Sequence, residues 1–340
     1  MTVCMSLQKK YIRKLIIGED MNNKEAYIEL CSREKTIPIF LRHWWLDVVK
    51  EDGEWDVIIE KKGENIIAAL PFYYKNKFGI KYITQPILTQ KTGLWIKYPV
   101  GQNYTKKLSY EKETMTSIIE KLDALQFQGY KQHFDYSITN WLPFYWKGYS
   151  QTTRYTYVLE DISNIDKVLL NFDSSKRKNI RKAEKIVEIR YDLSAEDFYA
   201  NHKMTLKKQG QNILYSFEVF NKIYNACYER NNGRVFYAVD NVGNIHCALF
   251  IIWDEISAYY LINTIDPKYR NVGAASLTIS EAIKYVANYT KKFDFEGSMI
   301  ENVENSYRRF GAVQVPYFCI YKEYSRLFKM LNQINKIVKR

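Results

Sequence analysis

The segment Arg270-Asn271-Val272-Gly273-Ala274-Ala275 has the residue types and spacing of a phosphate-binding loop. It follows a predicted strand at 259–264 and opens a predicted helix at 274–289. Small residues let the backbone approach a phosphate closely, and the free N–H groups at a helix start carry partial positive charge. Lys268 and Arg270 can add charge-assisted contacts. We therefore predict that an anionic donor is bound by Lys268, Arg270, Asn271, Val272, Gly273, Ala274 and Ala275.

A pair of carboxylates lies in the predicted strand 293–296. Asp294 and Glu296 alternate along it, so both side chains are expected on the same face. An amine must lose a proton before it attacks a carbonyl, and a carboxylate with a raised pKa can accept that proton. Glu296 is the predicted base, and Asp294 and Ser298 are predicted substrate ligands. The structural alternative is that Asp294 pairs with a buried arginine and Glu296 caps the next helix.

Other candidate substrate contacts are basic or aromatic. Arg177 and Arg181 share one face of a predicted helix, where they could bind an acceptor diphosphate or RNA phosphate, or simply form a solvated surface. His43 and Trp45 belong to a predicted helix at 38–49, and an exposed tryptophan there could stack on a sugar or base. The alternative is that Trp45 is part of the core. Tyr260, in the strand before the donor loop, is also a predicted substrate contact.

The elements that must position these residues occur twice in the same order. Asn65-Ile66-Ile67-Ala68-Ala69-Leu70 resembles Asn244-Ile245-His246-Cys247-Ala248-Leu249, and Phe134-Asp135-Tyr136 resembles Phe293-Asp294-Phe295. Chance similarity between strand patterns is the alternative to duplication. The repetition predicts a mixed-sheet α/β fold with two tandem copies. We expect an N-terminal extension at 1–25, a first domain at 26–150, a donor-binding second domain at 151–325 and a basic amphipathic helix at 326–340.

Two motifs of the second copy resemble those of the GNAT acyltransferase superfamily. The R-x-x-G-x-A pattern resembles its coenzyme A pyrophosphate loop. Tyr307-Arg308-Arg309-Phe310-Gly311 resembles its Y-x-x-x-G-F element, with Ala312 in place of the usual aromatic residue. The resemblance implies that Tyr307 protonates the leaving group, although it could be an ordinary surface tyrosine. Arg309 is predicted to stabilise the oxyanion or bind a substrate phosphate.

The order of elements over residues 35–325 is similar to one branch of that superfamily, the FemABX-like peptidyltransferases and BioF2-like acyltransferases, which have tandem GNAT folds. The segments 175–183 and 293–298 support this resemblance. The first copy has a loop with Pro and Gly at 84–105 where a second R-x-x-G-x-A would stand. One donor site is therefore expected, and the first copy would hold the acceptor or support the cleft.

Composition narrows the range of partners. The 340 residues carry a net charge of +12, which suits anionic partners such as a coenzyme, a nucleotide-sugar, tRNA or an acidic membrane surface, although lysine-rich composition is common. The five cysteines form no CxxC pair and have no metal-like spacing with the four histidines, so no metal site is expected. No stretch approaches the roughly 20 apolar residues of a spanning helix. A cytoplasmic protein is expected, with peripheral contact to the inner face of the membrane as a further option.

These features predict a transferase. The leading prediction is an N-acyltransferase that moves an acyl group from acyl-CoA to an amine on a cell-envelope precursor, either an amino sugar or a peptide. The first alternative is FemX-like transfer of an amino acid from aminoacyl-tRNA to a peptidoglycan precursor. An alternative of another class is a non-catalytic, basic nucleic-acid-binding protein on the same fold, with RNA rather than DNA as its partner.

Overall fold

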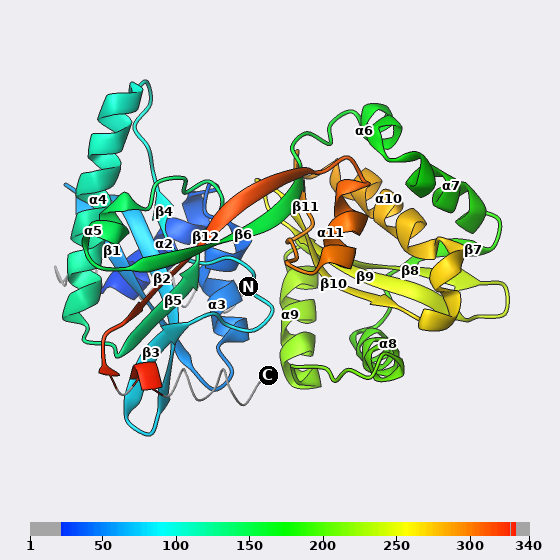
Figure 1. Ribbon diagram of the computed structural model, residues 1–340, viewed down its shortest axis with the longest axis horizontal. Helices are drawn as coiled ribbons and strands as arrows, with labels where there is room; N and C mark the ends of the chain where they lie inside the picture. The colour runs from blue at the N-terminus through cyan, green and yellow to red at the C-terminus, as the bar shows by residue number, and fades with distance from the viewer. Residues whose placement is uncertain (1–21, 327, 331–340) are drawn as a thin grey trace, which may run out of the picture.

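The computed structural model describes residues 22–326 and 328–330 and shows a mixed α/β fold (Figure 1). The elements of its first half are α2 (Asn23–Arg33), η1 (Ile39–Leu41), α3 (His43–Val49), β1 (Glu54–Lys62), β2 (Asn65–Lys77), β3 (Ile80–Thr84), β4 (Trp95–Ile96), α4 (Tyr104–Ala124), β5 (Gly129–His133) and α5 (Leu142–Trp146). The second half begins with β6 (Ser150–Leu159), α6 (Ile165–Asn171), α7 (Ser174–Ala183), β7 (Val187–Tyr191), α8 (Ala195–Lys208) and α9 (Phe217–Glu229). It continues with β8 (Gly233–Asp240), β9 (Ile245–Trp253), β10 (Ala258–Ile265), η2 (Pro267–Val272), α10 (Ala274–Val286), β11 (Phe293–Asp294), α11 (Glu301–Arg308) and β12 (Val313–Glu323).

The predicted duplication is visible in the order and pairing of these elements. Each half contains an antiparallel meander, β1-β2-β3 in the first and β8-β9-β10 in the second. A long helix follows each meander, α4 or α10, and leads to a strand that runs parallel to the third strand of the meander. These parallel pairs are β3 with β5 and β10 with β11. The tandem α/β fold expected from the sequence is therefore confirmed.

The two halves share one sheet because each contributes a strand to the junction. The strand order is β1-β2-β3-β5-β12-β6-β11-β10-β9-β8-β7, with β4 paired to β2. The last strand, β12, pairs with β5 of the first half, whereas β6 pairs with β11 of the second half. β6 and β12 also pair with each other from Ser150↔Tyr321 to Val158↔Val313, and they bridge the two halves in Figure 1. The predicted boundary near residue 150 thus falls at the start of a strand that joins the halves.

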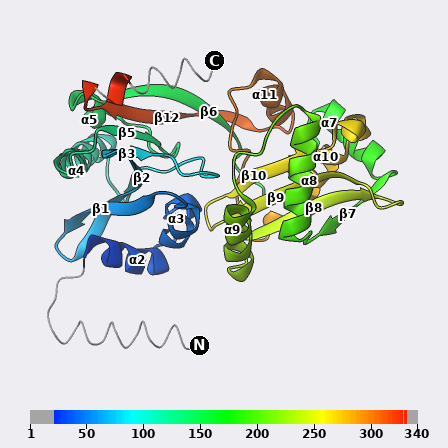
Figure 2. The ribbon, with the colours of Figure 1, turned by 90° about the horizontal axis from the view of Figure 1, so that it is seen from below.

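Helices cover both faces of the sheet, so several strands are buried on both sides. In β9, Leu249 and Ile251 pack with α10, while Phe250 and Ile252 pack with α8 and α9 on the opposite face. This explains the nearly continuous apolar sequence of the strand. In the first half α4 covers one face and α2 the other (Figure 2).

Three predicted boundaries are wrong. The sequence also predicts helical segments over 164–187, but Phe172, whose backbone is extended (ψ 139°), interrupts them, and Asp173 caps the new helix α7. Helix α7 ends at Ala183, and Val187, the predicted end, is the first residue of β7, which pairs with β8. The predicted helix at 38–49 is divided into η1 and α3 because Arg42 is extended.

The chain ends are described only in part. Helix α2 begins at Asn23, inside the predicted extension 1–25, and buries Ala26 and Tyr27, so the folded part starts earlier than expected. Residues 1–21 lie outside the described part of the chain, as does most of the predicted helix at 326–340. Among the described helices, none combines the length and the apolar character needed to cross a bilayer.

Candidate functional site

The candidate site lies where the parallel pairing of β10 and β11 stops. The two strands pair only at Ala258↔Phe293 and Tyr259↔Asp294. β10 continues to Ile265, whereas β11 ends at Asp294 because the chain turns at Glu296 and Gly297, with φ values of 59° and 65°. The turn needs glycine at 297, since a Cβ there would overlap the carbonyl oxygen of Tyr155 on β6.

Aromatic side chains line the region beyond the last paired residues. The ring of Tyr307, on α11, lies 4.9 Å from that of Phe295 and 5.7 Å from that of Tyr260 on β10, measured between centroids. Burial, together with the carboxyls of Glu296 and Asp294, raises the pKa of Tyr307 above its usual range. The structure therefore brings Tyr260, Asp294, Glu296 and Tyr307, predicted separately, into one cluster, which we call the Glu296 cluster.

Asp294 is held by a buried lysine that was not predicted from the sequence. Lys91, in the loop 85–94 of the first half, is 3% exposed and forms an ion pair with Asp294, which is 0% exposed. Lys91 Nζ also lies 3.6 Å from Asp135 Oδ2. Burial alone would lower the pKa of Lys91, but these two carboxylates raise it above its ordinary value.

Two further hydrogen bonds engage the other carboxylate oxygen of Asp294. Thr156 Oγ1 and the backbone N–H of Glu296 both donate to Asp294 Oδ1, the latter over 2.8 Å. Both carboxylate oxygens are thus engaged by the protein. The prediction of Asp294 as a substrate ligand is therefore wrong: it pairs with a buried base, a lysine rather than the arginine considered, and it orients Glu296.

Glu296 differs from Asp294, because its carboxyl group is not fully paired among the described residues. It is 8% exposed, and within the described residues its Oε1 atom is buried and has no hydrogen-bond partner. Burial raises the pKa of Glu296 well above that of a free carboxyl; Lys91 counteracts this effect and Asp294 adds to it. Its backbone carbonyl accepts a hydrogen bond from Gln90 Nε2. A buried, unsatisfied carboxyl with a raised pKa is typical of an acid or base awaiting a substrate.

The predicted phosphate loop lies at the amino end of α10, and α7 covers one side of it. Gly273 is the N-cap residue, with φ 91°, and is buried. A Cβ at this position would lie 2.5 Å from the carbonyl oxygen of Asn179 on α7. Lys182, also on α7, donates to the carbonyl oxygen of Asn271 over 2.8 Å. The space that Gly273 leaves is therefore filled by the backbone of α7, so this glycine allows the loop to pack closely against α7.

Replacement of Gly273 with alanine is expected to lower the free energy of unfolding by about 2–4 kcal/mol, because a Cβ adds both backbone strain and a clash with Asn179. Denaturant unfolding measures the loss. Gly243 is a matched control, since its φ is 89° but no atom lies within 4 Å of a Cβ built there. Gly243→Ala should cost only about 1 kcal/mol, from strain alone. Equal losses in the two variants would contradict the packing role of Gly273.

A small polar cavity of about 240 Å³ lies beside the covered loop, between α7 and α11. Its lining residues are Ser175, Lys176, Asn179, Asn302, Asn305, Ser306 and Arg309. Lys176 donates to Ser306 over 2.9 Å, and burial together with Arg309 lowers the pKa of Lys176 to about 8. The nearby carboxylate of Asp173 accepts hydrogen bonds from Ser175, which lower its pKa, and the charge of Arg309 adds a smaller effect in the same direction. Arg309 is thus placed in a cationic cavity next to Tyr307.

The other predicted substrate residues lie apart from the Glu296 cluster. Arg177 Nη1 donates to the carbonyl oxygens of Leu170 and Phe172 at the end of α6, and Arg181 is exposed on α7. Trp45 is fully buried and donates to Thr89 Oγ1 over 2.9 Å, so the prediction that it stacks on a ligand is wrong.

His43 and Ser298 are the remaining predicted substrate residues. His43 is half-buried, and burial lowers its pKa. Ser298 accepts from the N–H of Ile300 over 3.0 Å and so stabilises the turn before α11.

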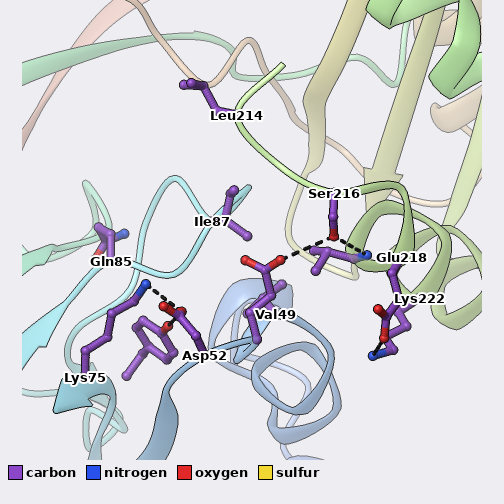
Figure 3. A pocket seen from close by; sticks show the side chains of 12 residues that line it. Val49, Asp52, Lys75, Gln85, Ile87, Leu214, Ser216, Glu218 and Lys222 are labelled. Carbon is purple, nitrogen blue, oxygen red and sulfur yellow. Dashed lines mark hydrogen bonds and ion pairs between the residues drawn. The ribbon is translucent and has the colours of Figure 1, made fainter. Parts of the chain in front are cut away.

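A large cavity of about 760 Å³ lies between the halves, and nothing in the sequence indicated it (Figure 3). Its first-half lining is Val49, Glu51, Asp52, Tyr73, Lys75, Gln85 and Ile87, and its second-half lining is Leu214, Ser216, Glu218, Val219 and Lys222. Asp52 pairs with Lys75, and Glu218 pairs with Lys222, each over 2.6 Å. Gln85 is at the start of the loop whose Gln90 contacts Glu296, so this loop connects the cavity with the cluster.

Comparisons with known proteins agree with this architecture. Residues 171–301 match the family model of the acetyltransferase (GNAT) domain. Among solved structures, FemX is similar over 93% of this chain and 98% of its own, with a TM-score of 0.69 and 12% identity. L-PGS from Bacillus licheniformis is similar over 94% of this chain and 98% of its own (TM-score 0.55, 10% identity).

The C-terminal domain (DUF2156) of a putative lysylphosphatidylglycerol synthetase from Agrobacterium fabrum is similar over 93% and 97% (TM-score 0.54, 7% identity). No curated protein matches the sequence. The matched domain contains the donor loop and, of the Glu296 cluster, Tyr260, Asp294 and Glu296, whereas Tyr307 follows its end; the structural likeness extends over both halves. Residues 171–301 thus match a GNAT acetyltransferase domain, and the chain as a whole has a tandem fold similar to that of FemX.

Proposed function

We propose that this protein transfers an acyl or aminoacyl group from an activated carrier to an amine on a cell-envelope precursor, with Glu296 as the general base. The observation that carries the proposal is the buried, unpaired Oε1 atom of Glu296 beside Tyr307. This arrangement offers one group that accepts a proton and one that donates a proton, which is what acyl transfer to an amine requires.

In the proposed reaction the acceptor amine binds next to Glu296 and gives up a proton to its carboxylate. The amine nitrogen then forms a bond to the carbonyl carbon of the carrier, and the bond from that carbon to the carrier oxygen or sulfur breaks. The leaving atom takes the proton of Tyr307, and Tyr307 regains a proton from the new amide nitrogen. The ion pair of Lys91 and Asp294 keeps Glu296 in place, because the Asp294 carboxylate accepts from the Glu296 backbone N–H. Asp294 is thus a positioning residue rather than a proton carrier.

The acceptor is proposed to enter from the cavity of about 760 Å³ between the halves. Glu51, Asp52 and Glu218 line it, and Lys75 and Lys222 neutralise two of these three carboxylates. A cavity of this size suits a sugar or peptide acceptor, and the excess carboxylate favours a protonated amine on it. Likeness to FemX and to a putative lysylphosphatidylglycerol synthetase supports an envelope precursor as the acceptor class.

Two carriers remain candidates, acyl-CoA and aminoacyl-tRNA. Acyl-CoA follows from the R-x-x-G-x-A loop, whose glycine packs against α7. Aminoacyl-tRNA is the alternative, and its phosphates would instead meet Lys176 and Arg309 in the cavity between α7 and α11. Either carrier would place its carbonyl near Tyr307.

Purified protein should be assayed with labelled acetyl-CoA and with labelled aminoacyl-tRNA, each with amino-sugar and peptide-amine acceptors, and the products identified by mass spectrometry. Amide formation from one carrier supports the proposal and identifies the carrier. Amide formation from neither, together with tight RNA binding, would instead indicate a non-catalytic RNA-binding protein.

Replacement of Tyr307 with phenylalanine is expected to lower kcat about 10–100-fold with a carrier that has a poor leaving group, because the leaving atom then lacks a positioned proton donor. The loss should be smaller with a carrier whose leaving group has a low pKa. Steady-state kinetics with the two carriers measures the difference. Tyr260→Phe is the matched control, since Tyr260 packs against Tyr307 in the same cluster. Equal losses in both variants would argue against proton donation by Tyr307.

A further inference from the structure

An exposed apolar surface lies at the outer end of the first half. We call it the α4–α5 surface; it consists of Val100, Tyr104, Leu108, Leu142, Tyr145 and Trp146. The exposed fraction is 58% for Tyr145, 57% for Trp146 and 74% for Tyr104. Single exposed apolar residues are ordinary, but a group of them that includes three aromatic side chains marks an interaction surface.

The surface exists because α4 is longer than the sheet that it covers. Met115, Ile118 and Leu122 of α4 are buried in the core of the first half. The first turns of the helix extend past the strands (Figure 1). Tyr104 and Leu108 belong to these turns and are exposed. A cavity of about 360 Å³ opens beside them, lined by Tyr104, Lys107, Leu108, Glu111, Thr139, Asn140, Trp141, Leu142 and Phe318.

Lysines surround the aromatic residues. Lys112 Nζ lies 5.5 Å from the centre of the Trp146 ring, and Lys107 and Lys147 flank the surface on α4 and after α5. Carboxylates lie among these lysines: Lys107 Nζ is 3.7 Å from Glu111 Oε1, and Glu113 is exposed beside Lys112 on α4. Glu111 is buried and accepts from Tyr98 and Asn140, and Glu120 pairs with Lys147 over 2.8 Å.

Tryptophan and tyrosine combine an apolar body with a polar tip, which suits the headgroup region of a bilayer. Lysines near them are attracted to anionic lipids and can extend their ammonium groups toward the headgroups. A protein partner of matching charge would need acidic residues around an apolar centre. A bilayer with anionic lipids needs no such specific surface, because negatively charged headgroups border its apolar interior at every point.

We propose that the α4–α5 surface docks on an anionic lipid bilayer. Membrane docking is a property separate from the proposed transfer reaction. Only the role that we assign to docking, which is to present a lipid-linked acceptor to the site, rests on that reaction. The surface borders the site through residues 135–142. Thr139 to Leu142 line the cavity at α4, while Asp135 to Ile138 line a neighbouring cavity of about 510 Å³, and Asp135 is a partner of Lys91.

The test is sedimentation of the full chain with two kinds of vesicle, phosphatidylcholine alone and phosphatidylcholine mixed with phosphatidylglycerol. We expect binding to the anionic vesicles that weakens at high salt, and little binding to the neutral ones. The double variant Tyr145→Ser/Trp146→Ser and the double variant Lys107→Gln/Lys112→Gln should each bind at least tenfold more weakly. Phe78→Ser is the matched control, since Phe78 is likewise an exposed aromatic residue but lies in the β2–β3 turn.

Unchanged binding in both double variants, or equal binding to neutral and anionic vesicles, would overturn the proposal. A dimer that the Tyr145→Ser/Trp146→Ser variant dissolves, seen by light scattering without vesicles, would assign the surface to a second copy of the chain instead. Transfer to a water-soluble amine without vesicles should be the same in the wild type and both double variants. If the wild type shows no transfer to the soluble amine, the proposed reaction is contradicted, and the docking result is unaffected.

Discussion

Replacement of Lys91 with methionine is expected to lower the free energy of unfolding by about 3–5 kcal/mol. The methionine fills most of the space of the lysine stem but leaves Asp294, which is 0% exposed, as a buried charge without its partner. Asp135 loses a second, weaker contact at 3.6 Å. Because Lys91 belongs to the first half and Asp294 to the second, the variant should also weaken the junction between them. Urea unfolding followed by circular dichroism measures the loss.

A matched control and a double variant separate this effect from a general loss of lysine. Lys97 is 61% exposed and pairs with Glu34 over 2.8 Å, so Lys97→Met should change stability by less than about 1 kcal/mol. In Lys91→Met/Asp294→Asn the uncompensated charge is gone, and part of the stability should return. A Lys91→Met protein as stable as the Lys97→Met control would show that the pair contributes nothing to the junction.

The fold was largely predictable because its evidence is local. Strands such as β9 are marked by apolar runs between turn residues, and the likeness of Asn65–Leu70 to Asn244–Leu249 reflects equivalent positions in β2 and β9. The parallel pair β10–β11 follows from the strand–helix–strand order of the second half. The break at Phe172 was missed because it depends on the extended backbone of one residue between two good helix sequences.

The candidate site was predictable only where its residues are close in sequence. Glu296 and Tyr307 were found because both belong to segments that resemble a family pattern. Lys91 lies 203 residues from Asp294 and stands in a loop without periodicity, so nothing local indicated the pair. The contact of Gly273 with Asn179 is also a tertiary one, and it gives the glycine a different role from the one its motif suggested. A sequence pattern shows that a residue must be small without showing what occupies the space.

Replacement of Glu296 with glutamine is expected to reduce kcat/KM for amide formation about 10²–10⁴-fold, because the amide cannot accept the proton of the acceptor amine. The variant keeps the shape of the side chain, and Asp294 still accepts from its backbone N–H. In the wild type the rate should rise with pH as Glu296 loses its proton, and this dependence should disappear in the variant. Glu301→Gln, an exposed neutralisation at the start of α11, should retain wild-type activity and pH dependence.

The same substitution should stabilise the folded protein above the pH at which a free carboxyl titrates. Burial raises the pKa of Glu296 in the folded state, so the folded protein binds more protons than the unfolded chain as the pH rises from about 4.5. Folding of the wild type therefore becomes less favourable through this interval, while glutamine has no proton to lose. We expect the melting temperature of Glu296→Gln to exceed that of the wild type at pH 8 and the difference to shrink toward pH 4. If the variant is inactive but no more stable than the wild type at pH 8, ionisation of Glu296 in the folded protein costs little free energy. The raised pKa that a base needs would then arise from the bound substrate rather than from burial.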